Sequence, residues 1–137
     1  MSIIYTEITL KNTTDAGMAE RGLIKEAEVR QTTVNALVDT GAWTLVINEA
    51  IRAQLGLKIR EHSDATVAGG KVEECDITEP VTVCWQDRET ECRAVVLPEE
   101  EDVLLGAYPL KGMDLVIHPG LETIIGAHGG KVYYMVK

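Results

Sequence analysis

The chain has 137 residues, 45% of them hydrophobic, which is enough for one domain with one small core. Acidic residues outnumber basic ones by 22 to 13, and the net charge of −9 disfavours binding to nucleic acid or to an anionic membrane surface. The longest apolar runs are far shorter than the roughly 20 residues that cross a bilayer, and the first residues lack the basic start and apolar centre of a signal peptide. We therefore expect a single domain over residues 1–137, located in the cytoplasm, with no nucleic-acid or membrane partner.

The first thirty residues predict an opening hairpin. Residues 3–10 and 29–34 alternate apolar and polar side chains, as strands with one buried face do. Residues 12–17 between them are rich in turn-forming side chains and predict a turn or flexible loop.

The sequence Asp39-Thr40-Gly41-Ala42 is the most informative stretch of the chain. It lies between residues 32–38 and 43–47, whose β-branched and apolar side chains predict two buried strands. A carboxylate on a turn between buried strands is expected to be desolvated, which is unfavourable unless it has a partner or is protonated. Asp39 is therefore a candidate for chemistry, although Asp and Gly also favour ordinary Asx turns.

One short helix is predicted over residues 48–56. Asn48 is a capping residue, an acidic first turn follows it, and the final Gly56 is a typical helix terminator. Trp43, between the Asp39 turn and this helix, is expected in the core, with a substrate pocket as the alternative.

Two hairpins are predicted next. Residues 65–67 and 71–73 flank Ala68-Gly69-Gly70, whose glycines can adopt positive φ angles at a hairpin tip. Residues 80–85 and 92–97 predict a second hairpin around a charged turn at 86–91.

The last forty residues predict short elements separated by turns. An acidic, solvated loop at 98–102 precedes the apolar strand Val103-Leu104-Leu105, which ends at Gly106. A turn or single helical turn at 108–113, a strand at 114–119 and an apolar end strand at 131–137 follow.

The cysteines and histidines show no metal-ligand spacing. The three cysteines cannot all pair within one chain, and we expect them to be reduced and structural. The alternative is a disulfide between Cys84 and Cys92, which could face each other across the turn at 86–89 if the compartment were oxidising. The histidines are scattered along the chain, so we assign them no role. The sequence therefore predicts no metal and no cofactor.

The stretch 36–42, Ala-Leu-Val-Asp-Thr-Gly-Ala, resembles the active-site signature of the retropepsin-like (retroviral-type, clan AA) aspartic proteases. Val103 to Gly106 resembles that family's second signature, in which an apolar pair and a glycine pass behind the active-site loop. The resemblance implies an all-β, pepsin/retropepsin-like, closed β-barrel-type single domain with one short helix. Leu104, Leu105 and Gly106 would support the loop from behind.

The resemblance also implies roles for the remaining motif residues. Asp39, Thr40 and Gly41 would be catalytic, with the Thr40 hydroxyl bonding the loop of a second copy and the Gly41 N–H orienting the Asp39 carboxylate. The glycine hairpin lies where the family carries its flap. Four residues of this hairpin are then expected to bind substrate: Val67, Ala68, Gly69 and Gly70. Ala42, beside the Asp39 turn, is expected to bind substrate as well. An ordinary hairpin turn explains these glycines equally well.

A single Asp-Thr-Gly motif is half of an active site, because this route of peptide hydrolysis needs two carboxylates that share a proton. The sequence therefore predicts a homodimeric aspartic endopeptidase that pairs two copies of Asp39, cleaves a peptide or protein substrate and interleaves its end strands. Two alternatives stay open. One is a catalytically weak dimerisation or peptide-binding module, and the other is a monomeric all-β ligand-binding barrel.

Overall fold

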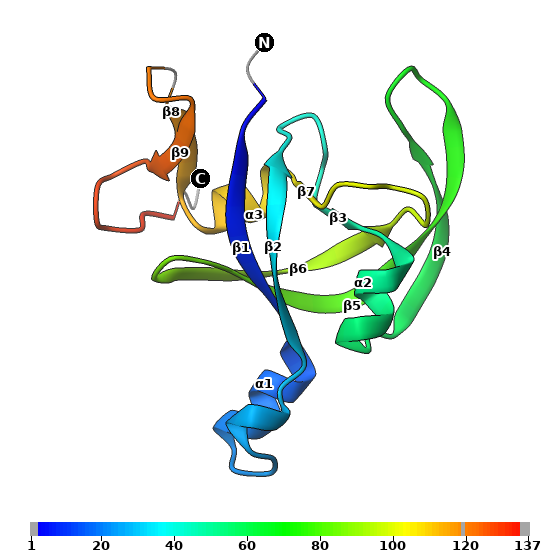
Figure 1. Ribbon diagram of the computed structural model, residues 1–137, viewed down its shortest axis with the longest axis vertical. Coiled ribbons are helices and arrows are strands. Elements are labelled where there is room, and N and C mark those ends of the chain that lie inside the picture. The colour runs from blue at the N-terminus through cyan, green and yellow to red at the C-terminus, as the bar shows by residue number, and fades with distance from the viewer. Residues whose placement is uncertain (1–2, 119, 135–137) are drawn as a thin grey trace.

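The computed structural model describes residues 3–118 and 120–134, and β-strands dominate it (Figure 1). The strands are β1 (Tyr5–Asn12), β2 (Gln31–Val38), β3 (Leu45–Ile47), β4 (Ile59–Thr66), β5 (Val72–Trp85), β6 (Arg88–Val96), β7 (Leu104–Leu105), β8 (Leu115–His118) and β9 (Thr123–Gly126). The helices are α1 (Thr13–Glu20), α2 (Glu49–Leu55) and α3 (Ala107–Gly112), with a 3₁₀ turn at Glu26–Glu28. The all-β class predicted from the sequence is confirmed.

Strand β1 hydrogen-bonds to both β2 and β5, and this double pairing closes a ring in the order β1, β2, β7, β3, β6, β5. The short strand β7 runs parallel to β2, and β3 runs parallel to β6. Strand β4 extends the sheet beyond β5, and β8 and β9 form a separate pair. In Figure 1 the tip of the β4–β5 hairpin lies at the top of the view, and α1 lies at the bottom.

The predicted helix after the Asp39 loop is present as α2. The Asn48 side chain accepts a hydrogen bond of 2.9 Å from the Ile51 N–H, which satisfies a free donor of the first turn. At the other end Gly56 adopts φ +63°, the left-handed conformation that glycine accepts without strain. Asn48 and Gly56, the two residues from which the helix ends are predicted, therefore form those ends in the structure.

The prediction of one short helix is wrong, because α1 replaces the expected turn between β1 and β2. Four of its eight residues are poor helix formers (Thr13, Thr14, Asp15 and Gly17), but the Asn12 side chain caps it by accepting a 3.0 Å hydrogen bond from the Asp15 N–H. The buried Asp15 carboxylate also accepts bonds of 2.8 and 3.0 Å from the guanidinium of Arg30, next to the start of β2. These contacts hold the helix where local propensity does not.

The second hairpin has a tighter turn than expected. Strand β6 begins at Arg88, so only Gln86 and Asp87 connect it to β5, and Gln86 adopts φ +51°. The register places Cys84 opposite Glu89 and Cys92 opposite Val81, so the two cysteines do not face one another. All three cysteines are free.

The end strand predicted at 131–137 is absent over its described part, residues 131–134, and the rest lies outside the described residues. The buried Arg88 instead fixes the chain where this segment begins. Its guanidinium donates to the Met113 carbonyl at 2.8 Å, to the Gly129 carbonyl at 2.6 Å and to the Lys131 carbonyl at 3.4 Å. The Asp114 carboxylate adds bonds to His128 at 2.6 Å and to the Tyr133 N–H at 3.0 Å. Strand β9, which the sequence did not predict, pairs with β8 beside this network.

The main core fills the interior of the ring. Its fully buried side chains come from the ring strands, from α2 and from the segments after α2 and α3: Ile8, Leu10, Leu45, Ile47, Leu55, Leu57, Val81, Val83, Val96, Leu105 and Met113. A second, smaller cluster of Val46, Cys75, Ile77 and Val95 lies where the β4–β5 hairpin leaves the ring. None of the helices in the described ranges is long and apolar enough to cross a membrane.

Candidate active site

The Asp39 loop connects β2 to β3 and is closed by its own hydrogen bonds. The Gly41 N–H donates to Asp39 Oδ1 at 2.9 Å, and the Ala42 N–H donates to the Asp39 carbonyl at 3.1 Å. The Asp39 N–H donates to the Leu105 carbonyl at 3.0 Å, which fixes the loop to β7. The backbone therefore sets the direction of the carboxylate.

The environment of Asp39 is less enclosed than predicted. Strand β2 alternates exposed and half-buried side chains and buries only Ala36 fully, and Asp39 itself is half-buried. Within the described part of the chain, the Gly41 N–H is the single hydrogen-bond donor to the carboxylate. The expectation that buried strands desolvate Asp39 on several sides is therefore wrong for one chain by itself.

Thr40 is exposed at the outermost point of the loop. Its hydroxyl makes no hydrogen bond within residues 3–118 and 120–134, so the geometry of a single chain leaves this donor and acceptor accessible to an external group.

Strand β7 and Gly106 pass directly behind the loop. Leu104 pairs with Leu37 and Leu105 pairs with Val38, in parallel register. A Cβ atom on Gly106 would lie 2.2 Å from the Thr44 carbonyl oxygen and 2.6 Å from that of Ala42, far inside van der Waals contact. Only glycine permits this approach with the present backbone, and Leu105 and Gly106 are both buried.

A cleft of about 800 Å³ opens beside the carboxylate. The Asp39 loop forms one side, the β4–β5 hairpin forms another, and the apolar floor consists of Val46, Ile77, Val95, Leu97 and Leu104. Such a concave, mainly apolar site with a few polar groups is typical of a binding site.

Six of the predicted site residues line the cleft together: Asp39, Gly41, Ala42, Val67, Ala68 and Leu104. Five do not line it: Thr40, Gly69, Gly70, Leu105 and Gly106. The two hairpin glycines form the tip of the β4–β5 turn with φ +89° and +80°, and the Gly70 N–H donates to the Val67 carbonyl at 3.0 Å. The hairpin therefore approaches the cleft through its arm and not through its glycines.

Trp43 lines the cleft and is 59% exposed, so the prediction that it belongs to the core is wrong. Its carbonyl accepts a 3.0 Å bond from the Tyr108 N–H, and this bond ties the loop end to α3 while the indole faces outward. The alternative expected from the sequence, a position in the pocket wall, matches the structure.

Sequence reasoning missed three carboxylates in the cleft wall, those of Glu61, Asp64 and Glu100. Glu61 and Asp64 lie on β4, and Glu100 belongs to the acidic loop that was expected to be merely solvated. Whether these side chains lie beside the cleft depends on the register in which β4 pairs with β5, and no local sequence pattern specifies that register.

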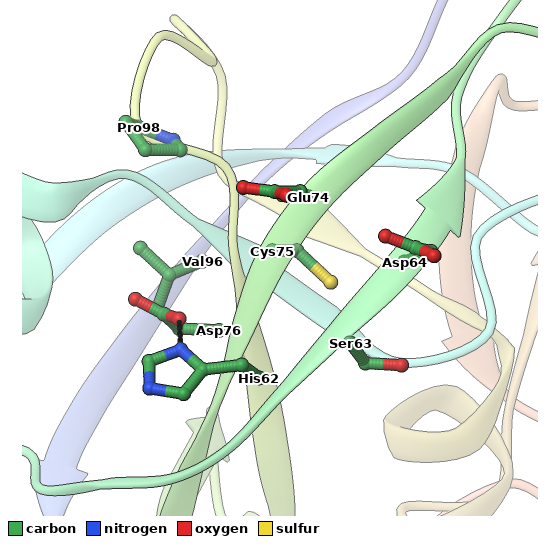
Figure 2. A pocket seen from close by; sticks show the side chains of 8 residues that line it. All are labelled: His62, Ser63, Asp64, Glu74, Cys75, Asp76, Val96 and Pro98. Carbon is green, nitrogen blue, oxygen red and sulfur yellow. Dashed lines mark hydrogen bonds and ion pairs between the residues drawn. The ribbon is translucent and has the colours of Figure 1, made fainter.

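A second cavity of about 590 Å³ lies against the same hairpin (Figure 2). His62 on β4 points toward Asp76 on β5, and the dashed line in Figure 2 marks the hydrogen bond between them. Cys75 lines both cavities, and burial, reinforced by the neighbouring Asp76 carboxylate, raises the pKa of its thiol. A thiol with a raised pKa stays protonated at neutral pH and is a poor nucleophile.

Among the described residues, no three His, Cys, Asp or Glu side chains lie together as a metal site. Asp39 in the larger cleft is therefore the best-placed chemical group.

The family-model match agrees with a catalytic role for the Asp39 loop. Residues 25–112, which include the Asp39 loop, the β4–β5 hairpin and β7, match the family model described as gag-polyprotein putative aspartyl protease. No curated protein sequence matches the chain. Among solved structures, EIAV protease complexed with the inhibitor HBY-793 is 28% identical, with a TM-score of 0.48, over 58% of this chain and 76% of that one. Since the family model covers more than half of the chain, this protein belongs to the retroviral-type, retropepsin-like aspartyl protease family.

Proposed function

We propose that the protein is a homodimeric aspartic endopeptidase that hydrolyses peptide bonds with a water molecule held between two Asp39 carboxylates. The observation that carries the proposal is the Asp39 carboxylate, oriented by the Gly41 N–H at 2.9 Å at the edge of a cleft of about 800 Å³. A cleft of this size accommodates several side chains of an extended peptide.

The chemistry requires a second carboxylate. One ionised Asp39 removes a proton from water, whose oxygen adds to the peptide carbonyl carbon, while the protonated Asp39 of the partner donates its proton to the carbonyl oxygen. The tetrahedral intermediate then breaks its C–N bond. The Asp39 that took the proton from water gives it to the leaving nitrogen, while the other, now ionised, takes a proton from a hydroxyl of the intermediate as the C=O bond re-forms. Each chain supplies one such group, so the site is complete only in a dimer.

The exposed face of the loop suits this dimer. Asp39 is half-buried and Thr40 is exposed in the single chain, and both would become buried when a second loop packs against them. The Thr40 hydroxyl would then form a hydrogen bond with the backbone of the opposing loop.

Replacing Asp39 by Asn tests the proposal. Among residues 3–118 and 120–134, the carboxylate accepts one hydrogen bond, from the Gly41 N–H. An amide oxygen can accept the same bond, so the variant is expected to fold and dimerise like the wild type. Cleavage of a mixed peptide pool, followed by mass spectrometry, should be lost. Cleavage by the variant at the wild-type rate would contradict the proposal, and inhibitor binding without cleavage by the wild type would favour a peptide-binding module.

A cytoplasmic location and a protein substrate are also proposals. The net charge of −9, which favours solubility in an aqueous compartment, supports the first of them.

A further inference from the structure

A third cavity, of about 530 Å³, adjoins the cleft beside Asp39, since Trp43 and Thr44 line both. Strand β6 leads from one to the other. Val95 lies on the floor of the cleft, and Arg93, two residues earlier on the same face of the strand, lines the third cavity. Two residues of a strand span about 7 Å. A peptide in the cleft therefore reaches this cavity within a few residues.

The third cavity differs from the cleft in its charge. Arg60 and Arg93 line it together with one carboxylate, that of Glu91, whereas acidic groups line the cleft and no Lys or Arg does. Arg60 has no ion pair with any residue in the described ranges. Arg93 lies 3.6 Å from Glu61, but about half of each side chain is exposed, so water screens this pair. The cavity therefore offers two guanidinium groups to an anion.

A β-bulge directs Arg60 toward the third cavity. Ile59 and Glu61 pair with two adjacent residues of β5, so Arg60 between them is an extra residue in β4. In a regular strand Ile59 and Glu61 would share a face. Here Ile59 packs against the main core while Glu61 lines the cleft, so the strand changes face at Arg60. Bulges of this kind re-aim side chains and are frequent beside active sites.

Two exposed aromatic rings give an independent indication of a ligand. Trp43 and Tyr108 both line the third cavity and are 59% and 58% exposed. The Tyr108 N–H donates to the Trp43 carbonyl at 3.0 Å, which holds the two residues side by side. Trp is highly buried on average, and Trp, Tyr and Arg are the residue types that contribute most to binding at protein interfaces. The rings and the guanidinium groups therefore favour one kind of ligand, a polypeptide that carries an acidic side chain.

We infer that the third cavity is an accessory subsite for an acidic side chain of the peptide held in the cleft, with Arg60 and Arg93 as specificity-determining residues. The carboxylates that line the cleft repel an acidic side chain there, so the preference for an acid is confined to an outer position of the peptide. Trp43 and Tyr108 contact the aliphatic part of the same residue. The inference rests on the proposed peptidase function for cleavage, whereas peptide binding tests it without that function.

Three substitutions vary the charge of the third cavity, and a fourth is the control. Arg60→Gln and Arg93→Gln each remove one positive charge, and Glu91→Gln removes the competing negative charge. All three side chains are exposed, so the variants are expected to fold. Arg21→Gln removes the same charge as the first two variants from another exposed side chain. Arg21 follows the end of α1 (Figure 1), does not line the cavity and has no ion pair with a described residue.

The probes are short peptides with blocked ends and a Leu-Leu centre joined by a reduced amide, which cannot be hydrolysed. Each carries Glu, Gln or Lys at one outer position, and fluorescence anisotropy gives the dissociation constants. At the outer position that reaches the third cavity, the Glu peptide should bind about two- to fivefold more tightly than the Gln peptide, the range of an exposed ion pair, and the Lys peptide should bind more weakly. Arg60→Gln and Arg93→Gln should each reduce this advantage, Glu91→Gln should increase it, and Arg21→Gln should leave it unchanged. Added salt should weaken it.

The same peptides with an ordinary Leu-Leu bond separate failure of the inference from failure of the proposed function. Tighter binding of a Glu peptide through the two arginines, without cleavage of any peptide, would refute the peptidase proposal and leave the inference standing. Cleavage of the peptides with no outer position at which Glu is favoured would overturn the inference and leave the peptidase proposal standing. Equal effects of Arg21→Gln and Arg60→Gln, or the absence of peptide binding, would overturn the inference as well.

Discussion

Gly106→Ala provides a sharp test of the packing behind the active-site loop. The new Cβ would lie 2.2 Å from the Thr44 carbonyl oxygen, whereas carbon and carbonyl oxygen normally approach to about 3.3 Å. One of the two backbones must therefore shift by roughly 1 Å. The φ of Gly106 is −87°, which alanine adopts easily, so the whole effect comes from this steric overlap.

The expected loss of stability follows from the groups that would move. Overpacking costs about 1–3 kcal/mol, and the same shift weakens the bond of 2.9 Å from the Ala107 N–H to the Ala42 carbonyl, worth about 1 kcal/mol. We therefore expect a loss of about 3 kcal/mol, a large part of the stability of a domain of this size.

Urea unfolding monitored by circular dichroism measures the loss, and Gly130→Ala is the control. A Cβ on Gly130 meets nothing within 4 Å, so this variant should stay within about 0.5 kcal/mol of the wild type. Peptidase activity of Gly106→Ala should also fall, because the shift displaces the Asp39 loop. A Gly106→Ala protein as stable and active as Gly130→Ala would refute the close passage.

Three further variants test other parts of the account. Asp15→Asn should lower the free energy of unfolding by about 1–3 kcal/mol at pH 7, because it breaks the bidentate pair with Arg30. The hydrogen bonds from Arg30 hold the pKa of Asp15 below its usual 3.8. The difference in stability between wild type and variant is therefore fully present above pH 3.8 and shrinks as the pH falls through the lowered pKa. Equal stabilities in urea at pH 7 would contradict the role of this ion pair. Gly17→Ala should raise the unfolding free energy by up to about 1 kcal/mol, since the new Cβ meets only the Arg21 guanidinium, at an ordinary contact distance of 3.7 Å. A lower unfolding free energy in this variant would mean that α1 is not helical at Gly17. Trp43→Ala should change the free energy of unfolding by less than about 1 kcal/mol while weakening peptide binding, because the indole is exposed. A loss of about 3–5 kcal/mol in thermal or urea unfolding would instead show that Trp43 is a core residue.

The segment from β2 to α2 was predictable because its signals are local. The β-branched run before Asp39, the Asp-Thr-Gly-Ala turn and the Asn48 and Gly56 caps each specify structure within a few residues of themselves. The hairpin at Gly69 and Gly70 was predictable for the same reason, since positive φ angles at its tip require glycine.

The features that were missed depend on residues far apart in the chain. Helix α1 is stabilised by Arg30, fifteen residues beyond Asp15, and its own sequence reads as a turn. The irregular end segment is fixed by Arg88, which contacts a carbonyl forty-one residues later. Exposure of Trp43 and the acidic wall of the cleft follow from the pairing of β7 with β2 and of β4 with β5. Sequence periodicity specifies which residues can be buried, but not which strand will cover them.

The central claim is that one active site needs the Asp39 carboxylates of two chains, and subunit mixing tests it directly. Wild type and Asp39→Asn are mixed in equal amounts, allowed to exchange subunits and assayed at a fixed total concentration. Random pairing leaves about one quarter of the dimers with two carboxylates, so a shared site should give about a quarter of the activity of pure wild type. Activity of one half would show that each wild-type chain acts independently of its partner, and it would contradict the shared site.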